Sequence, residues 1–403
     1  MLAVLAGTLA GVALGTISGL VPGLHANTLA GVLLAFDSAL LPVFGPEILA
    51  AVLFGALITH SFLDIIPGTF LGVPSADTPL AILPAHRLCM AGLGKEAVRL
   101  SVLGSAMGVV IGVPAAILAL YLMPALQPGI DWGIGILVIA VAGYLIVTSD
   151  APGWSLSIFS LSGLLGLFCF RYSYLSWNTL GEGSVLMPLL SGLFGIALLS
   201  RAGAGKFPDQ RFTGTGVSTR QIVRSTTVGS IAGGLVGWLP GLSNATANAV
   251  LTPFIGTENQ ERCFIAATGA ANTANALLGL AALYALERTR NGVMVAISMQ
   301  EIPPFGTLLF AGCVAACCAY GIAVAVAGKA GKFNGIDVKN LNIVVIGIIT
   351  ALSILLCGPF GLLILCLATA IGYAPALLNL HRVSCMGAIM VPLILSSFGL
   401  LSW

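Results

Sequence analysis

The chain has 403 residues, of which 58% are hydrophobic and only 7% are charged, and its formal net charge is +2. Soluble globular domains carry about 25% charged residues, so this composition excludes a soluble protein and indicates an integral membrane protein. The near-neutral charge argues against nucleic acid as a partner. Apolar runs of about 20 residues recur along the chain without strict alternation, which favours membrane-spanning helices over a barrel of strands.

The first half begins with two apolar arms, 2–20 and 26–41, on either side of Pro22-Gly23. Proline removes a backbone hydrogen-bond donor and glycine loosens the chain, so the arms predict a helical hairpin that is broken inside the membrane. A polar corner at 42–47 follows the hairpin. The rest of this half consists of an apolar run at 48–63, an irregular piece at 64–84, and predicted spans at about 97–124, 132–148, 153–170 and 184–200.

A hydrophilic segment at 201–224 carries five basic residues and one acidic residue, and it links the two halves. We therefore divide the chain into a first transmembrane repeat at 1–200, a cytoplasmic linker at 201–224 and a second transmembrane repeat at 225–403. The second half follows the plan of the first, with a hairpin at 226–256, a span at 263–285, an irregular piece at 287–304, and spans at about 304–328, 341–357, 358–377 and 384–402.

The number of spans predicts how the two repeats are oriented. Each half has one hairpin, which returns to its own side, and about five spans, so the second half begins on the opposite face of the membrane from the first. The positive-inside rule agrees, because it places the basic segment 201–224 in the cytoplasm and both termini outside the cell. The predicted fold is an all-α polytopic protein of the plasma membrane with two inverted-topology repeats.

One motif occurs in both halves with identical spacing and marks both hairpins. Its glycines, four residues apart, predict close helix packing. Its Pro-Gly breaks expose backbone polar groups, which must be buried in protein or line a wet cavity. Paired broken helices at corresponding positions point to the binding site of a transporter. The two copies are Gly15, Gly19, Pro22-Gly23-Leu24 and Thr28, and Gly233, Gly237, Pro240-Gly241-Leu242 and Thr246.

Polar residues at the tips and at a second turn in each half are the candidate substrate ligands. Helix N-termini, hydroxyls and amides suit a carboxylate, and arginines add charge-assisted hydrogen bonds. The alternative for 287–290 is a short solvated loop. Matching Gly55 to Gly269 aligns Thr59 with Thr273 and Ser61 with Asn275. The candidates are Pro22, Gly23, Asn27, Thr28, Pro240, Gly241, Ser243, Asn244, Thr246, Asn272, Thr273, Asn275, Arg288 and Arg290.

Four ionisable residues are candidates for carrying a coupling proton or ligating a sodium ion, because such groups at membrane depth are costly and usually functional. They are Asp64, Asp77, His25 and His60. The alternatives are a local Asx-type turn for Asp77 and interior histidines whose hydrogen bonds are satisfied. No protease, hydrolase or zinc-ligand signature is present, so we expect no catalytic residue, no metal site and no cofactor beyond the coupling ion.

The two glycine-rich Pro-Gly-Leu hairpins resemble those of the large membrane subunit of tripartite tricarboxylate transporters, the TctA-like permeases. Segment 271–276, Ala-Asn-Thr-Ala-Asn-Ala, is similar to the asparagine-containing segment that follows the second hairpin in that family. The bacterial subunits usually have a further Pro-Gly element where this chain has 287–292, and they are longer, so the chain looks more like the compact archaeal-type branch. The resemblance implies cation-coupled uptake of carboxylates, in bacteria with a small membrane subunit and an extracytoplasmic binding protein.

Together these patterns predict a secondary-active transporter of small organic anions, with di- or tricarboxylates as the expected substrates and a proton or sodium ion as the coupling ion. We expect alternating access, with the tips Asn27/Thr28 and Asn244/Thr246 facing each other across one cavity. The expected partners are the anionic solute and the lipid bilayer. The sequence leaves both a monomer and a homo-oligomer as alternatives. The first alternative is a transporter or channel for another solute class, such as amino acids. An intramembrane enzyme and a membrane scaffold are the remaining alternatives.

Overall fold

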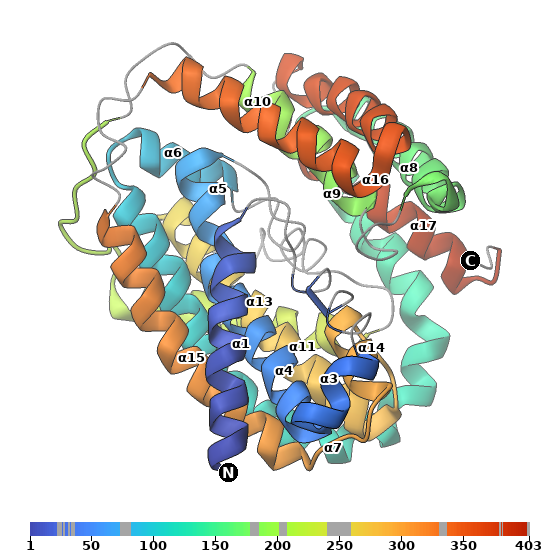
Figure 1. The fold of residues 1–403 in the computed structure, drawn as a ribbon. Helices are drawn as coiled ribbons and strands as arrows, with labels where there is room; N and C mark the ends of the chain where they lie inside the picture. The colour runs from blue at the N-terminus through green and yellow to red at the C-terminus, as the bar shows by residue number, and fades with distance from the viewer. Residues whose placement is uncertain are drawn as a thin grey trace.

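The computed structural model describes residues 1–21, 26, 29–30, 33, 37–72, 82–177, 185–200, 208–239, 259–329, 337–378, 380 and 382–400. The regular elements of these residues are all helices (Figure 1). Seven of the described helices are long and apolar enough to span a membrane by length and composition, and three shorter ones are apolar. The expectation of an all-helical, multi-pass membrane protein is confirmed.

The first half contains α1 (Leu2–Leu20), α3 (Asp37–Phe44), α4 (Pro46–Leu63), α5 (Ile65–Leu71), α6 (Ile82–Met90), α7 (Gly94–Val147), α8 (Pro152–Arg171), η1 (Ser173–Leu175), α9 (Leu186–Leu190), η3 (Ser191–Ile196) and α10 (Ala197–Leu199). The second half contains α11 (Thr219–Trp238), α13 (Gln260–Leu286), α14 (Gly292–Ser298), α15 (Phe305–Gly328), α16 (Val338–Leu377), η6 (Arg382–Met386) and α17 (Gly387–Ser397). Helices α1 and α11 end within two residues of Pro22 and Pro240.

Several segments that the sequence analysis treated as irregular are helical. The piece at 64–84 contains α5 and the start of α6, and the piece at 287–304 contains α14. Local capping explains α14, because the Asn291 side chain accepts a hydrogen bond from the Met294 N–H at 2.9 Å. Most of the predicted corner at 42–47 is helical, and only Gly45, which has a φ of 75°, separates α3 from α4. Helix α11 begins at Thr219, inside the predicted linker, behind a capping box.

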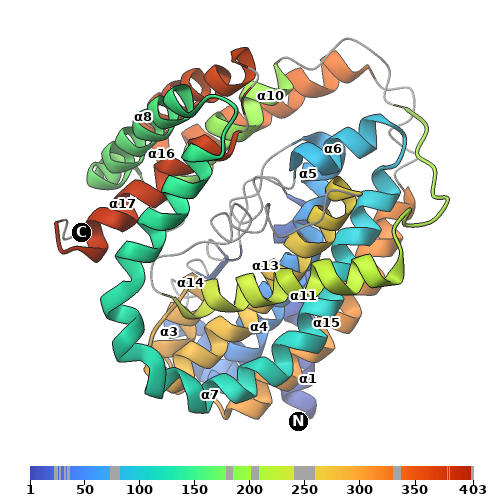
Figure 2. The ribbon, with the colours of Figure 1, turned by 180° about the vertical axis from the view of Figure 1, so that it is seen from behind.

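Helix α7 joins two segments that were predicted to be separate spans, 97–124 and 132–148. It is hydrogen-bonded as one helix of 54 residues, although it contains Pro114, Pro124 and Pro128. A straight helix of that length would be roughly 80 Å long, far more than the bilayer core. Figure 2 shows that α7 instead turns and runs back along the molecule. The prolines provide the physical cause, because each removes one backbone hydrogen bond and bends the helix without ending it.

Helix α16 behaves in the opposite way. Its residue Gly358 has a φ of 65° and a ψ of −155°, so two helices meet there at a sharp break. Only glycine adopts this backbone conformation readily. The break falls at the predicted boundary between spans 341–357 and 358–377, which confirms that boundary.

The helices form two groups, which α7 connects (Figure 1). The core bundle consists of α1, α3, α4, α5, α6, α11, α13, α14, α15 and the first part of α7. The flanking bundle consists of α8, α9, η3, α10, α16, α17 and the last part of α7. Gly108 of α7 lies against Ala270 of α13, whereas Gly135 of the same helix lies against Ser397 and Phe398 at the end of α17. One helix therefore belongs to both bundles.

Glycines bring α1 onto α4 and α11 onto α13 at backbone distance. A Cβ atom on Gly15 would lie 2.5 Å from the Ala56 carbonyl oxygen, and one on Gly237 would lie 2.7 Å from the Asn275 carbonyl oxygen. A Cβ on Gly233 would overlap the Ala271 carbonyl. These distances are too short for any side chain larger than hydrogen. The packing role predicted for the glycines of the repeated motif is confirmed.

The two halves of the chain interlock. In the core bundle, α7 of the first half packs on α13 of the second, and α15 of the second half packs on α4 of the first. In the flanking bundle, α8 packs on α17, and η3 packs on α16. The contact of α7 with α13 thus corresponds to that of α15 with α4, and the contact of α8 with α17 corresponds to that of η3 with α16. Each of these four contacts joins one half of the chain to the other.

Candidate functional site

Buried polar side chains gather where α4, α7 and α13 meet in the core bundle. We call Ser61, Asp64, Ser105, Asn272 and Thr273 the polar cluster. Ser61 Oγ lies 3.1 Å from Thr273 Oγ1, and Ser105 Oγ donates to the Gly269 carbonyl oxygen at 3.1 Å. All five residues are buried. Polar groups in such a place destabilise the protein unless they are hydrogen-bonded, and these bonds join helices from both halves.

Asp64 and Asn272 form the central contact of the polar cluster. Asn272 Nδ2 donates to Asp64 Oδ2 at 3.0 Å, and the two residues are 4% and 6% exposed, respectively. Asp64 lies at the junction of α4 and α5, and its backbone N–H still bonds to the carbonyl of His60. A carboxylate is thereby placed at the end of a buried helix, with an amide donor from the other half of the chain.

His60 links the polar cluster to the end of α1. It precedes Asp64 by one helical turn, and its Nδ1 lies 3.1 Å from the Ser18 hydroxyl oxygen. The last turn of α1 rests directly on α4, because a Cβ on Gly19 would lie 2.7 Å from the Leu63 Cβ. His60 and Asp64, two of the predicted ion-coupling residues, therefore lie one turn apart beside the end of α1.

The helices that carry the aligned residues face each other. The sequence alignment of the halves pairs Thr59 with Thr273 and Ser61 with Asn275. In the structure, Ser61 touches Thr273, the counterpart of its own neighbour Thr59. The contact joins α4 of the first half to α13 of the second.

Arg290 is tied to the end of α11. Its Nε donates to the Gly237 carbonyl at 3.1 Å, and its Nη2 donates to the Val236 carbonyl at 3.1 Å and to the Leu239 carbonyl. These carbonyls form the last turn of α11, directly before Pro240. A cation that hydrogen-bonds the last carbonyls of a helix stabilises that end of the helix.

The turn between α13 and α14 is therefore only partly a solvated loop. Glu287 and Thr289 are exposed, as that alternative expects, but Arg288 and Arg290 are half-buried. Asn275 is also half-buried and lies on the same side, since its backbone contacts Gly237 of α11. The structure thus places Arg290 and Asn275 beside the end of α11, and Asp64, Asn272 and Thr273 in the polar cluster.

The remaining predicted site residues lie outside the described residues. They are Pro22, Gly23, His25, Asn27, Thr28, Asp77, Pro240, Gly241, Ser243, Asn244 and Thr246. Ser18, Ser61 and Ser105 are not among the predicted site residues. Ser18 contacts His60, Ser61 contacts Thr273, and Ser105 donates to the Ser61 carbonyl oxygen. Serines at helical spacing beside Gly104 and Gly108 were the available signal for Ser105.

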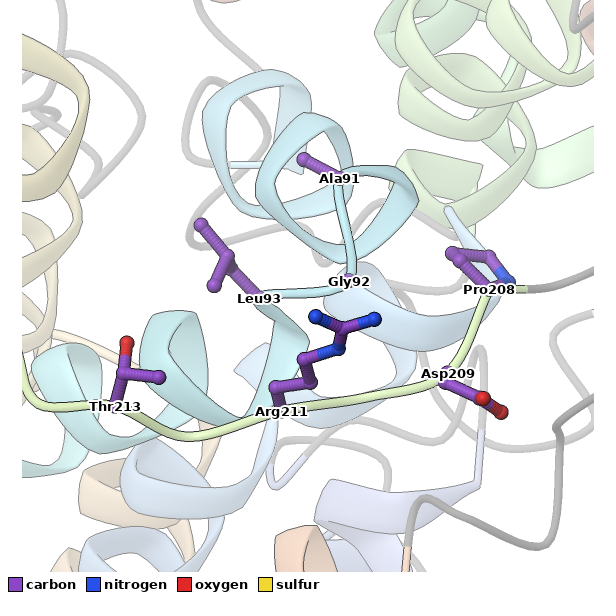
Figure 3. Close-up of a pocket in the computed structure, with 7 residues that line it drawn as sticks. All are labelled: Ala91, Gly92, Leu93, Pro208, Asp209, Arg211 and Thr213. Atoms are coloured by element: carbon purple, nitrogen blue, oxygen red, sulfur yellow. The ribbon is translucent and has the colours of Figure 1, made fainter.

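A cavity of about 510 Å³ lies elsewhere, where the linker crosses the turn between α6 and α7 (Figure 3). Gln210 fastens the linker there, because its Oε1 accepts from the Gly94 N–H at 2.8 Å and its Nε2 donates to the Cys89 carbonyl at 3.0 Å. The predicted site residues are absent from its lining, so we interpret it as a surface groove. The lining residues are Ala91, Gly92, Leu93, Pro208, Asp209, Arg211 and Thr213.

Two ion pairs join the halves on the same face. Arg262 Nε lies 2.6 Å from Glu96 Oε1, and the Glu96 side chain is almost fully buried. Arg87 and Glu261 form the second pair, which is exposed. Both pairs connect the N-terminus of α13 to the region of the α6–α7 turn, so they extend the close contact between α7 and α13 to the surface.

The long apolar helices and the buried polar contacts between two interlocked halves define a polytopic helical membrane protein with the construction of a transporter. The chain belongs to the tripartite tricarboxylate transporter TctA family, whose model matches residues 5–387. This is a family of membrane transporters and not of enzymes, and in the tripartite system it works with a small membrane subunit and a binding protein. The resemblance seen in the Pro-Gly-Leu hairpins is confirmed.

One curated relative is an uncharacterised protein, MJ1079, from Methanocaldococcus jannaschii. It is 29% identical over 301 residues, which cover 72% of this chain and 71% of that protein. No solved structure matches the chain.

Proposed function

We propose that the protein is a secondary-active transporter of small organic anions, namely di- or tricarboxylates, coupled to a proton or a sodium ion. The observation that carries this proposal is the buried contact between Asp64 and Asn272, which joins the two halves beside the end of α1. An ionisable residue inside a membrane-spanning bundle is costly, and its usual reason is an ion or substrate pathway. In this proposal Asp64 and His60 carry the coupling ion.

The anion binds at the broken ends of α1 and α11 in this proposal. Asn275 and Arg290 lie beside the end of α11, and Arg288 belongs to the same turn. The residues of the two Pro-Gly tips complete the site, as the sequence predicts. The tripartite system of the family supports a small membrane subunit and an extracytoplasmic binding protein as partners of this chain.

The corresponding contacts of the two halves support an inverted repeat. Helix α7 packs on α13 as α15 packs on α4, and α8 packs on α17 as η3 packs on α16. Ser61 of α4 also contacts Thr273 of α13, which aligns with Thr59. The odd number of spans that the sequence predicts in each half and the distribution of basic residues support an inverted second repeat, with both termini outside the cell.

The same contacts favour one kind of alternating access. Rocking one half of the chain against the other would have to separate α7 from α13, whose backbones touch at Gly108 and Ala270. We therefore propose that the core bundle moves as a unit against the flanking bundle. The bend of α7, which contains several prolines, is the connection that allows this movement.

Counterflow into proteoliposomes tests the function. The purified protein is reconstituted into proteoliposomes that are preloaded with di- or tricarboxylates or amino acids. Uptake is measured with and without a sodium or proton gradient. We expect exchange of at least one carboxylate and its gradient-driven accumulation. Exchange confined to amino acids would replace the proposed substrate class. Absence of uptake with the reconstituted small subunit and binding protein present would overturn the transporter proposal.

Tethers between engineered cysteines test which parts move. Arg87→Cys with Glu261→Cys, bridged by a short bifunctional thiol reagent, joins the two halves within the core bundle, and we expect transport to continue. Leu71→Cys with Ile346→Cys joins the two bundles, because both residues pack on one hydrophobic cluster, and we expect this tether to stop transport. If the halves rocked against each other, both tethers would stop transport, because each one joins the first half to the second. Loss of transport in the Arg87–Glu261 tether would therefore contradict the proposed movement. The exposed cysteines Cys317 and Cys366 are first replaced, so that the reagent reacts with the introduced pairs.

A further inference from the structure

The end of α11 poses an electrostatic difficulty for an anion site. The last carbonyls of a helix point along its axis and give that end a partial charge of roughly −0.5. The helix stops at Trp238, directly before the predicted binding tip. An anion that approaches this tip meets a negative helix end unless something offsets it.

Arg290 is placed to offset this charge. Its guanidinium donates to the carbonyls of Val236, Gly237 and Leu239, so three of the exposed acceptors are occupied by one cation. Gly279 of α13 lies beside the arginine, because a Cβ there would lie at an ordinary van der Waals distance of 3.6 Å from the Arg290 Cβ. These hydrogen bonds use Nε and Nη2, and both nitrogens bond to the helix end.

The equivalent helix end in the first half is built differently. Helix α1 has no basic residue in its last turn, and its contact there is the hydrogen bond between Ser18 and His60. The sequence alignment of the two turns places Ala76 opposite Arg290. The position that the alignment pairs with Arg290 therefore carries no cation in the first half of the chain.

We propose that Arg290 is a positioning residue that fixes the end of α11 and reverses the sign of its charge, so that this helix end favours multiply charged anions. This inference rests on the proposed transport of carboxylates. It differs from a direct substrate contact, because Arg290 acts through the helix end that it holds. A lysine at this position would keep the charge but lack the planar fork that reaches several carbonyls.

Three variants separate the two parts of this role. Arg290→Gln removes the charge and the fork, and Arg290→Lys removes the fork alone. Arg288→Gln removes a charge from the same turn and leaves the Arg290 side chain, which bonds to α11, in place. Hydrogen–deuterium exchange of the purified protein in nanodiscs follows the amides of residues 233–239. We expect at least tenfold faster exchange there in both Arg290 variants and no change in Arg288→Gln.

Equilibrium binding of succinate and of monomethyl succinate, a nearly isosteric monoanion, then measures the electrostatic part. Coulomb energy is proportional to the charge of the ligand, so loss of one cation should raise Kd for the monoanion about fivefold and Kd for the dianion about 25-fold. A purely structural role would raise both by the same factor. Arg290→Lys should recover most of the preference for the dianion although its helix end still frays.

The outcomes are distinct. Unchanged exchange in Arg290→Gln would overturn the anchoring role, and equal factors for the two anions would overturn the electrostatic role. If the wild-type protein binds no carboxylate in the wider panel, the proposed function has failed, and the exchange result still decides whether Arg290 holds α11.

Discussion

Replacing Asp64 by asparagine should separate exchange of the substrate from its coupling to an ion gradient. Asparagine has the size of aspartate and still accepts the hydrogen bond from Asn272, which is 3.0 Å long. The variant cannot bind a proton or offer a negative charge to sodium. We therefore expect Asp64→Asn to fold, to perform counterflow, and to lose gradient-driven accumulation.

The magnitudes follow from the contact. A hydrogen bond to a charged group contributes about 1.5–3 kcal/mol and a neutral one about 1 kcal/mol, so the bond loses about 1–2 kcal/mol in Asp64→Asn. Removal of a buried charge offsets part of this loss. Asn272→Ala should destabilise the protein more, by about 2–3 kcal/mol, because it takes the amide donor from a buried carboxylate. If one monovalent ion moves with each substrate, a tenfold ion gradient supplies about 1.4 kcal/mol, which sustains a tenfold accumulation of substrate in wild type.

Proteoliposomes with an imposed tenfold sodium or proton gradient provide the assay. Accumulation should fall from about tenfold in wild type to about onefold in Asp64→Asn, with exchange retained. Asp209→Asn makes the same chemical change at an exposed position in the linker and should accumulate substrate like wild type. Wild-type accumulation by Asp64→Asn would refute the assignment of ion coupling to this carboxylate.

Three further predictions concern stability, measured by unfolding in detergent. Gly233→Ala should cost about 1–3 kcal/mol or more, because its Cβ meets the backbone of α13, whereas Gly321→Ala, with open space around it, should change stability by less than about 1 kcal/mol. Glu96→Gln should cost about 1–3 kcal/mol, since it leaves Arg262 without the carboxylate that it contacts at 2.6 Å. A neutral effect of either Gly233→Ala or Glu96→Gln would contradict the packing described. Burial lowers the pKa of His86 below its ordinary value of 6.5, more than its hydrogen bond to the Thr69 carbonyl raises it. Stability from this neutral histidine is therefore complete above pH 6.5 and declines as the pH falls below that value. His86→Gln should lack this part of the decline, and an identical pH profile would refute the assignment.

The sequence predicted those features that depend on residues near one another in the chain. The ends of α1 and α11 follow from Pro-Gly, and the break in α16 follows from Gly358. The four-residue spacing of the glycines in the repeated motif predicts close helix packing, and Gly15, Gly233 and Gly237 make such contacts. Composition alone was sufficient for the membrane class, because a charged fraction of 7% leaves too few polar groups to solvate a soluble surface.

Other features depend on distant parts of the chain, and the sequence could not supply them. Nothing local indicates whether a proline in α7 ends the helix or bends it, since packing against α13 and α17 decides the outcome. The role of Arg290 is not visible from its turn, because its hydrogen-bond acceptors lie more than 50 residues earlier. Ser105 joins the polar cluster only because α7 crosses to the other half of the chain.

The charges beside the two helix ends show what fusing two repeats in one chain makes possible. If the repeats were identical copies, α1 and α11 would end in the same electrostatic surroundings. In this chain the end of α1 lies against His60, one turn from the Asp64 carboxylate, and the end of α11 is held by Arg290. A carboxylate and exposed helix carbonyls suit a cation, whereas a neutralised helix end beside an arginine suits an anion. Two positions that the sequence aligns thus differ in electrostatic character within one bundle, which fits the proposed coupling of an anion to a cation.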